Sequence, residues 1–333
     1  MSTFDLNSLG PIIQTLGWTL LHFLWQGAAI GVLFASGRLF IDLLKGSANS
    51  RYLFGLICMG LLALSPALTF LWLWETPGLA GVASTVALPT ISVTVSDFEA
   101  ASSLTLWLEN SLPWLVLAWA LGVLALSVRV LMSWRLARRM TQDGVIELDR
   151  RIVDNMKRMA DQFGISSAVK VVESALVQVP TVIGWLKPII LLPTSTLTCL
   201  TPTQLELVIA HELGHIRRFD YIVNLFQVAL ETLLFYHPVV RWISTDVRAA
   251  REVCCDDLVL KQCGQPTEYA KALLHLESMR GQVVAPGLAA TEGPLLQRIQ
   301  RMLDRPTKTK STCLLYTSPS PRDLSTSRMP SSA

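Results

Sequence analysis

Charged residues are scarce in this sequence. Only 16% of the 333 residues are Asp, Glu, Lys or Arg, whereas a soluble globular protein has about a quarter. Between Arg51 and Arg129 there is no lysine or arginine at all. Hydrophobic residues make up 51% of the chain, and the mean hydropathy is +0.44. A wholly soluble protein is therefore excluded, and part of the chain should lie in a membrane.

Two further absences exclude two classes of protein. The net charge of +3 is too small to indicate nucleic-acid binding, so we expect no direct contact with DNA or RNA. The six cysteines show no C-x-x-C spacing and no regular pairs, so a disulfide framework is not predicted. They are Cys58, Cys199, Cys254, Cys255, Cys263 and Cys313.

Three apolar segments are long enough to cross a bilayer, which takes about 20 residues of helix. They lie at about residues 12–36, 52–74 and 112–134, so residues 1–135 are predicted to form an N-terminal membrane region. The positive-inside rule then places the N-terminus outside and everything from Arg135 onward in the cytoplasm. The basic residues that fix this orientation are Arg38, Lys45 and Arg51 in the first loop and the WRLARRM run after the third span.

Residues 136–284 have the pattern of a cytoplasmic domain with helices and strands. A polar amphipathic stretch should form a helix that ends near Gly164. Residues 169–174 and 179–193 are rich in β-branched side chains and predict strands, with a hairpin turn between Gly184 and Pro188. The sequence Thr201-Pro-Thr-Gln204 predicts a helix start with a capping box.

The rest of the chain carries weaker signals. Residues 221–243 are apolar enough for a fourth span, but Asn224, Gln227 and Glu231 share one face. We therefore predict a helix buried in the cytoplasmic domain or lying against the membrane, and a true span stays the alternative. Residues 285–311 are predicted to be a linker. Residues 312–333, rich in Ser, Pro and Thr, are predicted to be a low-complexity, truncated or non-native end.

Residues 208–220, VIAHELGHIRRFD, contain the chemistry-bearing motif. On a helix His211 and His215 lie one turn apart on the same face, so both can bind one metal ion. Glu212 lies beside them and is placed to act as a general base on water. The surrounding positions are apolar, and buried histidines without a partner would be costly. We therefore predict a catalytic zinc site with one Zn2+ per chain.

A catalytic zinc ion takes three protein ligands, so one ligand must come from elsewhere. The extension H-x-x-G-x-x-H is excluded because Arg218 and Tyr221 stand where glycine and histidine are needed. Glu252 is the preferred third ligand, because Asp256 follows one turn later and could accept the free N–H of a ligand histidine. Glu231 and a cysteine, Cys254 or Cys255, remain alternatives, and His237 is a weak candidate for stabilising an oxyanion.

Taken together, HELGHIRRFD, FYHP and AREVCCDDLVL resemble the membrane-embedded zinc metallopeptidases of BlaR/MecR type, a gluzincin family of bacterial sensor-transducers. The resemblance covers about residues 10–310. It implies that His211, His215 and Glu252 bind zinc, that Glu212 is the catalytic base, and that the strand around Thr181–Leu192 borders the substrate cleft. Ala250 stands where members often have glutamate, and no penicillin-binding motif is present, so a β-lactam signal is not predicted.

The resulting expectation is a multi-pass α-helical membrane protein of the bacterial inner membrane, with an α+β gluzincin-like zinc metalloprotease domain in the cytoplasm. It should cut a cytoplasmic or membrane-associated protein in signal transduction, as an antirepressor does. A transcriptional repressor is then the expected substrate, the lipid bilayer surrounds the spans, and a homodimer stays open. The alternatives are a housekeeping quality-control protease and a catalytically silent zinc-binding sensor or scaffold.

Overall fold

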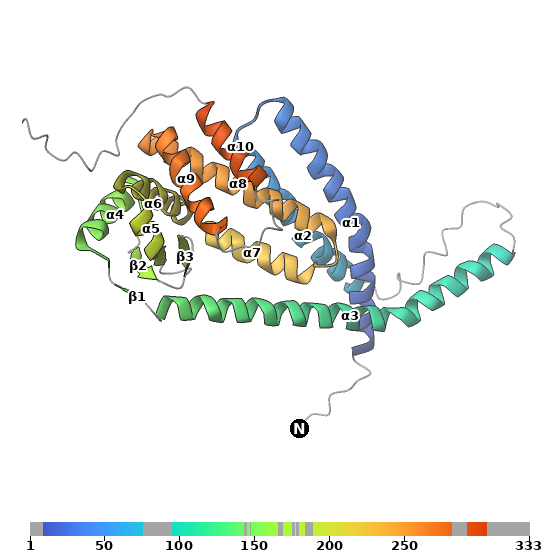
Figure 1. The fold of residues 1–333 in the computed structure, drawn as a ribbon. Coiled ribbons are helices and arrows are strands. Elements are labelled where there is room, and N and C mark those ends of the chain that lie inside the picture. The colour runs from blue at the N-terminus through green and yellow to red at the C-terminus, as the bar shows by residue number, and fades with distance from the viewer. Residues whose placement is uncertain are drawn as a thin grey trace, which may run out of the picture. The chain divides into compact units, whose positions relative to one another are not determined.

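The computed structural model describes residues 9–75, 95–142, 145–146, 148–165, 169–174, 177, 180–183, 189–281 and 292–304. Within these residues helices predominate, and one small sheet is present (Figure 1). The chain packs as two units. The first joins residues 1–133 to 225–250, and the second joins 134–224 to 251–333.

The N-terminal unit contains the predicted spans. They are α1 (Leu9–Leu43), α2 (Ala48–Glu75) and the greater part of α3 (Val95–Gln142). Among the described residues these are the helices long and apolar enough to cross a membrane, which confirms the three predicted segments. Gln26 of α1 donates to the hydroxyl of Thr69 in α2 at 2.8 Å. Large apolar side chains such as Val32, Leu39 and Trp114 are exposed along these helices, as expected for surfaces that face lipid.

Residues 221–243 do not form the single helix that was predicted. The structure has α7 (Asp220–Leu233) and α8 (Pro238–Cys263), separated at 234–237. Proline at the first position of α8 disfavours the helical conformation in the residue before it, which explains the break. The polar face of α7 bonds to α8: Gln227 donates to Ser244, and Arg248 donates to Glu231 at 2.7 Å. Polar residues in this stretch therefore join two helices.

Residues 225–250 pack in the N-terminal unit, whereas the sequence assigned them to the cytoplasmic domain of residues 136–284. Two glycines show why. A Cβ at Gly27 would lie 2.7 Å from His237 Nε2, and one at Gly55 would lie 2.5 Å from Val247 Cγ2. The spans thus lack side chains where the segment 225–250 presses against them. This complementarity between distant segments cannot be recognised from the sequence of either segment alone.

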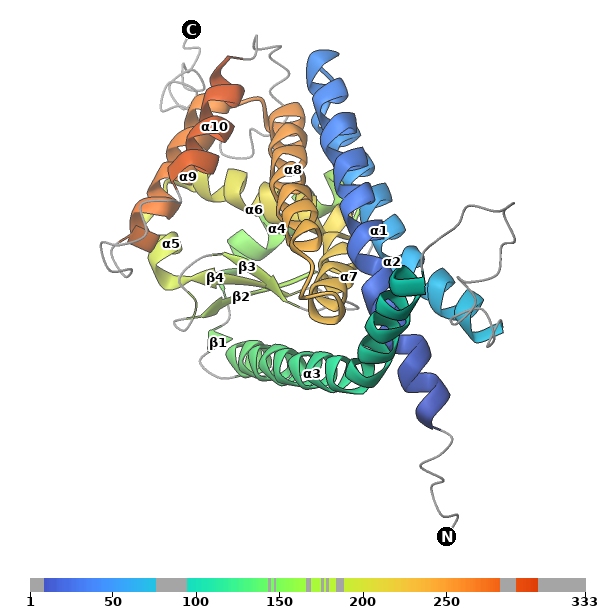
Figure 2. The ribbon, with the colours of Figure 1, turned by 90° about the vertical axis from the view of Figure 1, so that its right-hand side faces the viewer.

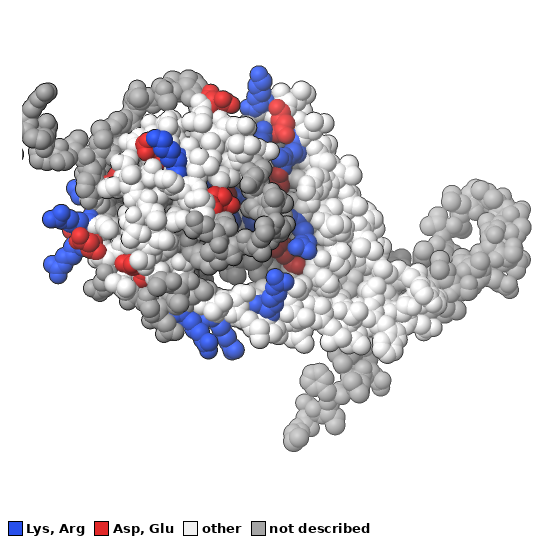
Figure 3. Space-filling view, viewed as in Figure 1, with Lys and Arg blue, Asp and Glu red and all other residues white. Residues whose placement is uncertain are grey.

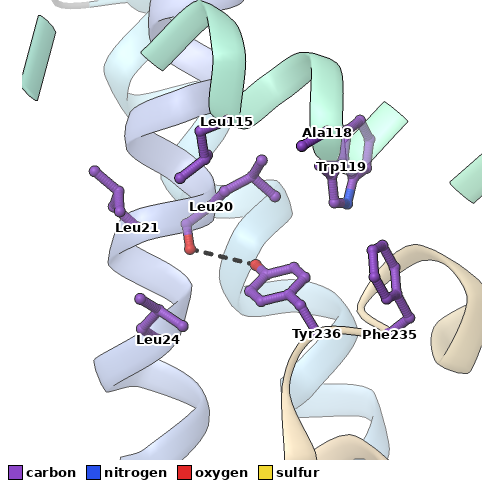
Figure 4. Close-up of a pocket in the computed structure, with 8 residues that line it drawn as sticks. All are labelled: Leu20, Leu21, Leu24, Leu115, Ala118, Trp119, Phe235 and Tyr236. Carbon is purple, nitrogen blue, oxygen red and sulfur yellow. Dashed lines mark hydrogen bonds between the residues drawn. The ribbon is translucent and has the colours of Figure 1, made fainter. Parts of the chain in front are cut away.

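A cavity of about 360 Å3 lies inside the N-terminal unit (Figure 4). Two of its lining side chains carry a polar group: Tyr236, whose hydroxyl donates to the carbonyl oxygen of Leu20 at 3.3 Å, and Trp119, whose Nε1 donates to the carbonyl oxygen of Leu233 at 2.8 Å. The lining residues are Leu20, Leu21, Leu24, Leu115, Ala118, Trp119, Phe235 and Tyr236.

The second unit holds a four-stranded sheet in the order β1-β2-β4-β3 (Figure 2). The strands are β1 (Val145–Ile146), β2 (Lys170–Ser174), β3 (Thr181–Ile183) and β4 (Ile189–Pro193). β2 and β4 are parallel, with Val171 opposite Ile190, and β3 and β4 are antiparallel, with Val182 opposite Ile190. The predicted strands and the pairing of β3 with β4 are confirmed, while the turn at 184–188 lies outside the described residues.

Helices complete this unit: α4 (Arg150–Gln162), α5 (Thr194–Cys199), α6 (Pro202–Arg217), α9 (Pro266–Gly281) and α10 (Glu292–Leu303), together with the last half of α8. As predicted, α4 ends near Gly164, which has a φ of +66°. The core contains Phe163 from the α4 end, Ile190 from β4, Leu213 from α6 and Val259 from α8. On the face shown in Figure 3, charged side chains gather over this unit, whereas the N-terminal helices are largely uncharged.

The predicted linker at 285–311 is wrong in its central part, which forms α10. Ile299 and Met302 of this helix are buried, and Met302 belongs to the core of the second unit. Leu295, Ile299 and Met302 follow the spacing of one helix face. This short pattern was missed because the sequence on either side of it shows no hydrophobic periodicity. The predicted end segment 312–333 lies outside the described residues.

Candidate metal centre

The helix α6 presents the two histidines of the motif. Thr201 caps it as predicted: its side chain accepts from the Gln204 backbone N–H, and the Gln204 side chain accepts from the Thr201 N–H, each at 3.3 Å. One face of α6 packs into the core through residues such as Ile209, Leu213 and Ile216. His211 is only 8% exposed and His215 is partly buried. The core thus fixes the helix that carries both imidazoles.

The structure brings His211, His215 and Glu252 together. The Nε2 atoms of the two histidines are 3.2 Å apart. Glu252 Oε2 lies 3.3 Å from His211 Nε2, and Glu252 Oε1 lies 3.7 Å from His215 Nε2. Ligands held at about 2.0–2.2 Å around a tetrahedral zinc ion are separated by about 3.3–3.6 Å. The three side chains therefore have the spacing of a zinc site.

Asp220 orients the second histidine. Its Oδ2 lies 2.8 Å from His215 Nδ1, and because a carboxylate only accepts, Nδ1 carries the proton and Nε2 keeps its lone pair. Asp220 is 3% exposed and begins α7, directly after Phe219, whose φ of 56° turns the chain. Sequence reasoning missed this residue, although an acid five residues after His215 in HELGHIRRFD was the available signal.

The first histidine is held through a tyrosine. Tyr269 of α9 donates its hydroxyl hydrogen to Asp256 Oδ1 at 2.7 Å, and its oxygen lies 2.8 Å from His211 Nδ1. Since this oxygen already donates its hydrogen to Asp256, it accepts from the Nδ1–H of His211. The predicted direct bond from Asp256 to a histidine is thus replaced: Asp256 lies 3.5 Å from His211 Nδ1. No periodic pattern around Tyr269 indicates this role.

Three acceptors converge as a result. With both Nδ1 atoms protonated, the two Nε2 lone pairs and the Glu252 carboxylate face one another at 3.2–3.7 Å. Such groups repel one another unless a cation lies between them. Two imidazoles and one carboxylate are a ligand set of catalytic zinc, so the residues fit this metal.

The carboxylate of Glu252 is kept ionised by its neighbours. Burial raises its pKa, but when the imidazoles are protonated instead of binding a metal, the hydrogen bond and charge of His211 and the charges of His215 and Arg298 outweigh burial and hold the pKa of Glu252 well below its usual range. An ionised carboxylate is the form that binds a metal. Glu212 is partly buried on α6, next to His211 in sequence.

Glu231 and Cys255, two of the alternatives for the third ligand, do not join the group formed by His211, His215 and Glu252. Glu231 is paired with Arg248 in the N-terminal unit. Cys255 contacts the other ring nitrogen, Nδ1 of His215, at 3.4 Å and Asp220 at 3.6 Å. Burial, followed by the charges of Asp220 and Glu252, raises the pKa of the Cys255 thiol far above its ordinary value, which disfavours a thiolate ligand.

His237 has a structural contact. Its Nδ1 accepts from the Val239 N–H at 3.3 Å, so Nε2 donates to the Leu24 carbonyl oxygen at 3.1 Å. Both ring nitrogens are therefore used within the N-terminal unit, and the oxyanion candidate loses its support. Every cysteine in the described part of the chain is free, as expected.

Known proteins match this chain. Residues 76–302 match the family described as BlaR1 peptidase M56. The regulatory protein BlaR1 of Bacillus licheniformis is 26% identical over 182 residues, which are 52% of this chain and 29% of that protein. The methicillin resistance mecR1 protein of Staphylococcus aureus is 28% identical over 105 residues, 31% of this chain and 18% of that protein. The chain thus spans less than a third of these curated relatives.

Proposed function

The chain belongs to the BlaR1 peptidase M56 family, a family of BlaR/MecR-type membrane sensor-transducers, and we propose that it is a membrane-bound zinc-dependent endopeptidase. The observation that carries the proposal is the convergence of His211 Nε2, His215 Nε2 and the Glu252 carboxylate. M56 peptidases are metal-dependent in general. Zinc is the metal that these donors favour at this spacing.

Each side chain then has a defined task. His211, His215 and Glu252 hold the metal, and Asp220 keeps the Nε2 of His215 available for it. A bound zinc ion would acidify water and polarise the scissile carbonyl group. Glu212 accepts the proton of the attacking water and passes it to the leaving amine. Asp256 supports His211 through Tyr269.

A substrate peptide is proposed to bind along β3. This strand is at the end of the sheet order β1-β2-β4-β3, and it contacts α6, which carries the histidines. An edge strand can pair with an extended peptide through backbone hydrogen bonds. The proposed substrate is a cytoplasmic or membrane-associated protein, cut at a backbone segment that adopts an extended conformation.

The proposed cellular role is signal transduction. The domain has a gluzincin-like α+β fold and lies on the cytoplasmic side of the bacterial inner membrane, with the N-terminus outside. It cuts a transcriptional repressor or a similar regulator. A housekeeping protease would share this chemistry but would cut unfolded proteins without a stimulus.

Metal removal tests the proposal. The protein purified in detergent should contain about one zinc ion per chain and hydrolyse a quenched fluorescent peptide library. Treatment with 1,10-phenanthroline should abolish hydrolysis, and added Zn2+ should restore it. Hydrolysis that persists in metal-free protein would refute the zinc peptidase, whereas bound zinc without any hydrolysis would favour the silent sensor or scaffold.

A further inference from the structure

The geometry points to Tyr269 and Arg298 as positioning residues that make the metal site depend on helix α10, the last helix in the described part of the chain. This inference rests on the proposed metal site. It goes beyond it because neither residue belongs to the ligand set or to the zinc motif. Arg298 acts on His211 through Asp256 and Tyr269, and Tyr269 bonds to both Asp256 and His211. Asp256 is 2% exposed.

Arg298 joins two acids of α8. Its Nε donates to Asp256 Oδ2 and its Nη2 to Asp256 Oδ1, both at 2.7 Å, so the pair is bidentate. Its Nη1 also lies 3.7 Å from Glu252 Oε2. One guanidinium group therefore fixes the plane of the Asp256 carboxylate and lies against the carboxylate of a predicted ligand.

The hydrogen bonds continue from Asp256 to the other ligand. Asp256 Oδ1 accepts from Arg298 and also from the hydroxyl of Tyr269. This second bond commits the hydrogen of Tyr269 to Asp256, so its oxygen can only accept from the Nδ1–H of His211. Because an imidazole protonated at Nδ1 presents its lone pair at Nε2, the chain from Arg298 to His211 selects the tautomer that binds metal.

Arg298 lies on α10, 42 residues after Asp256 in the sequence. The buried residues Ile299 and Met302 attach this helix to the core, and α10 lies along α9 in both views (Figures 1 and 2). One turn after Arg298, Arg301 pairs with Asp257 at 3.0 Å. Arg301 thus joins the same two helices by a single hydrogen bond to Asp257 instead of a bidentate pair with Asp256.

Zinc affinity of four variants tests the inference. Competition with a chelator would measure the Kd for Zn2+, and the visible spectrum of the Co2+ form would report ligand geometry. Tyr269→Phe and Arg298→Ala should each weaken zinc binding by about 10–100-fold and shift the Co2+ bands. Arg298→Lys keeps the charge but lacks the bidentate fork, so its Kd should lie between those of the wild type and Arg298→Ala. Arg301→Ala, the matched control, should change the Kd by no more than about fivefold and leave the spectrum unchanged.

A double variant distinguishes positioning of the zinc ligands from simple attachment of α10 to the rest of the unit. Since both residues belong to one hydrogen-bond chain that ends at His211, Tyr269→Phe combined with Arg298→Ala should lose less affinity than the two single losses multiplied together. Equal losses in Arg298→Ala and Arg301→Ala, or a Tyr269→Phe variant with wild-type affinity and spectrum, would overturn the inference. If the wild-type protein binds no zinc, the proposed function itself fails; if it binds zinc and these variants bind it equally well, only the present inference fails.

Discussion

Replacing Glu212 by glutamine is expected to lower the rate of peptide hydrolysis by about 10²–10⁴-fold, the usual contribution of a general base. Glutamine has the shape of glutamate but cannot accept a proton from water. Because Glu212 is not one of the three converging donors, the variant should keep its zinc. Hydrolysis by membranes containing each protein, together with the zinc content of the purified chains, measures both effects.

Glu206→Gln is the matched control for this substitution. Glu206 lies on the same helix and is 8% exposed. Burial raises its pKa, although the charge of Arg158 acts in the opposite direction. Because Glu206 is not one of the three converging donors, its replacement should leave hydrolysis intact. A Glu212→Gln variant as active as Glu206→Gln would rule out Glu212 as the base.

Replacing Glu252 by alanine is expected to remove zinc from the protein. The change leaves two imidazoles where three donors converged, and the loss of affinity should exceed the roughly 10–100-fold effect of an outer partner. Hydrolysis should disappear with the metal. Inductively coupled plasma analysis after dialysis against a weak chelator gives the zinc content per chain.

Glu231→Ala provides the comparison, because Glu231 was the competing carboxylate in the sequence. It pairs with Arg248, so its removal should cost some stability but leave zinc in place. Zinc retained by Glu252→Ala and lost by Glu231→Ala would reverse the assignment of the third ligand.

The parts of the fold that were predicted correctly have local signatures. The cap at Thr201, the histidine pair on α6 and the β3–β4 pairing each depend on residues close together in the sequence. The three spans depend on length and hydropathy, which are also local properties. The choice of Glu252 used the spacing to Asp256 along one helix, and the structure brings Glu252 to both histidines.

The parts that were missed depend on contacts between distant segments. Nothing near Tyr269 or Arg298 indicates that their side chains meet at Asp256, because their positions follow from the packing of α9 and α10. The grouping of residues 225–250 with the spans depends on glycines such as Gly27, whose missing side chain makes room for His237. Asp220 was within reach of sequence reasoning, since it follows the motif directly.

Zinc K-edge absorption spectroscopy of the purified protein tests the central claim most directly. Beside the group His211, His215 and Glu252 lies a second group of potential ligands, His215, Asp220 and Cys255. Only the second group contains sulfur. A zinc ion held by His211, His215 and Glu252 should show only nitrogen and oxygen neighbours at about 2.0–2.2 Å. A sulfur neighbour at about 2.3 Å would place the metal at Cys255 and contradict this account.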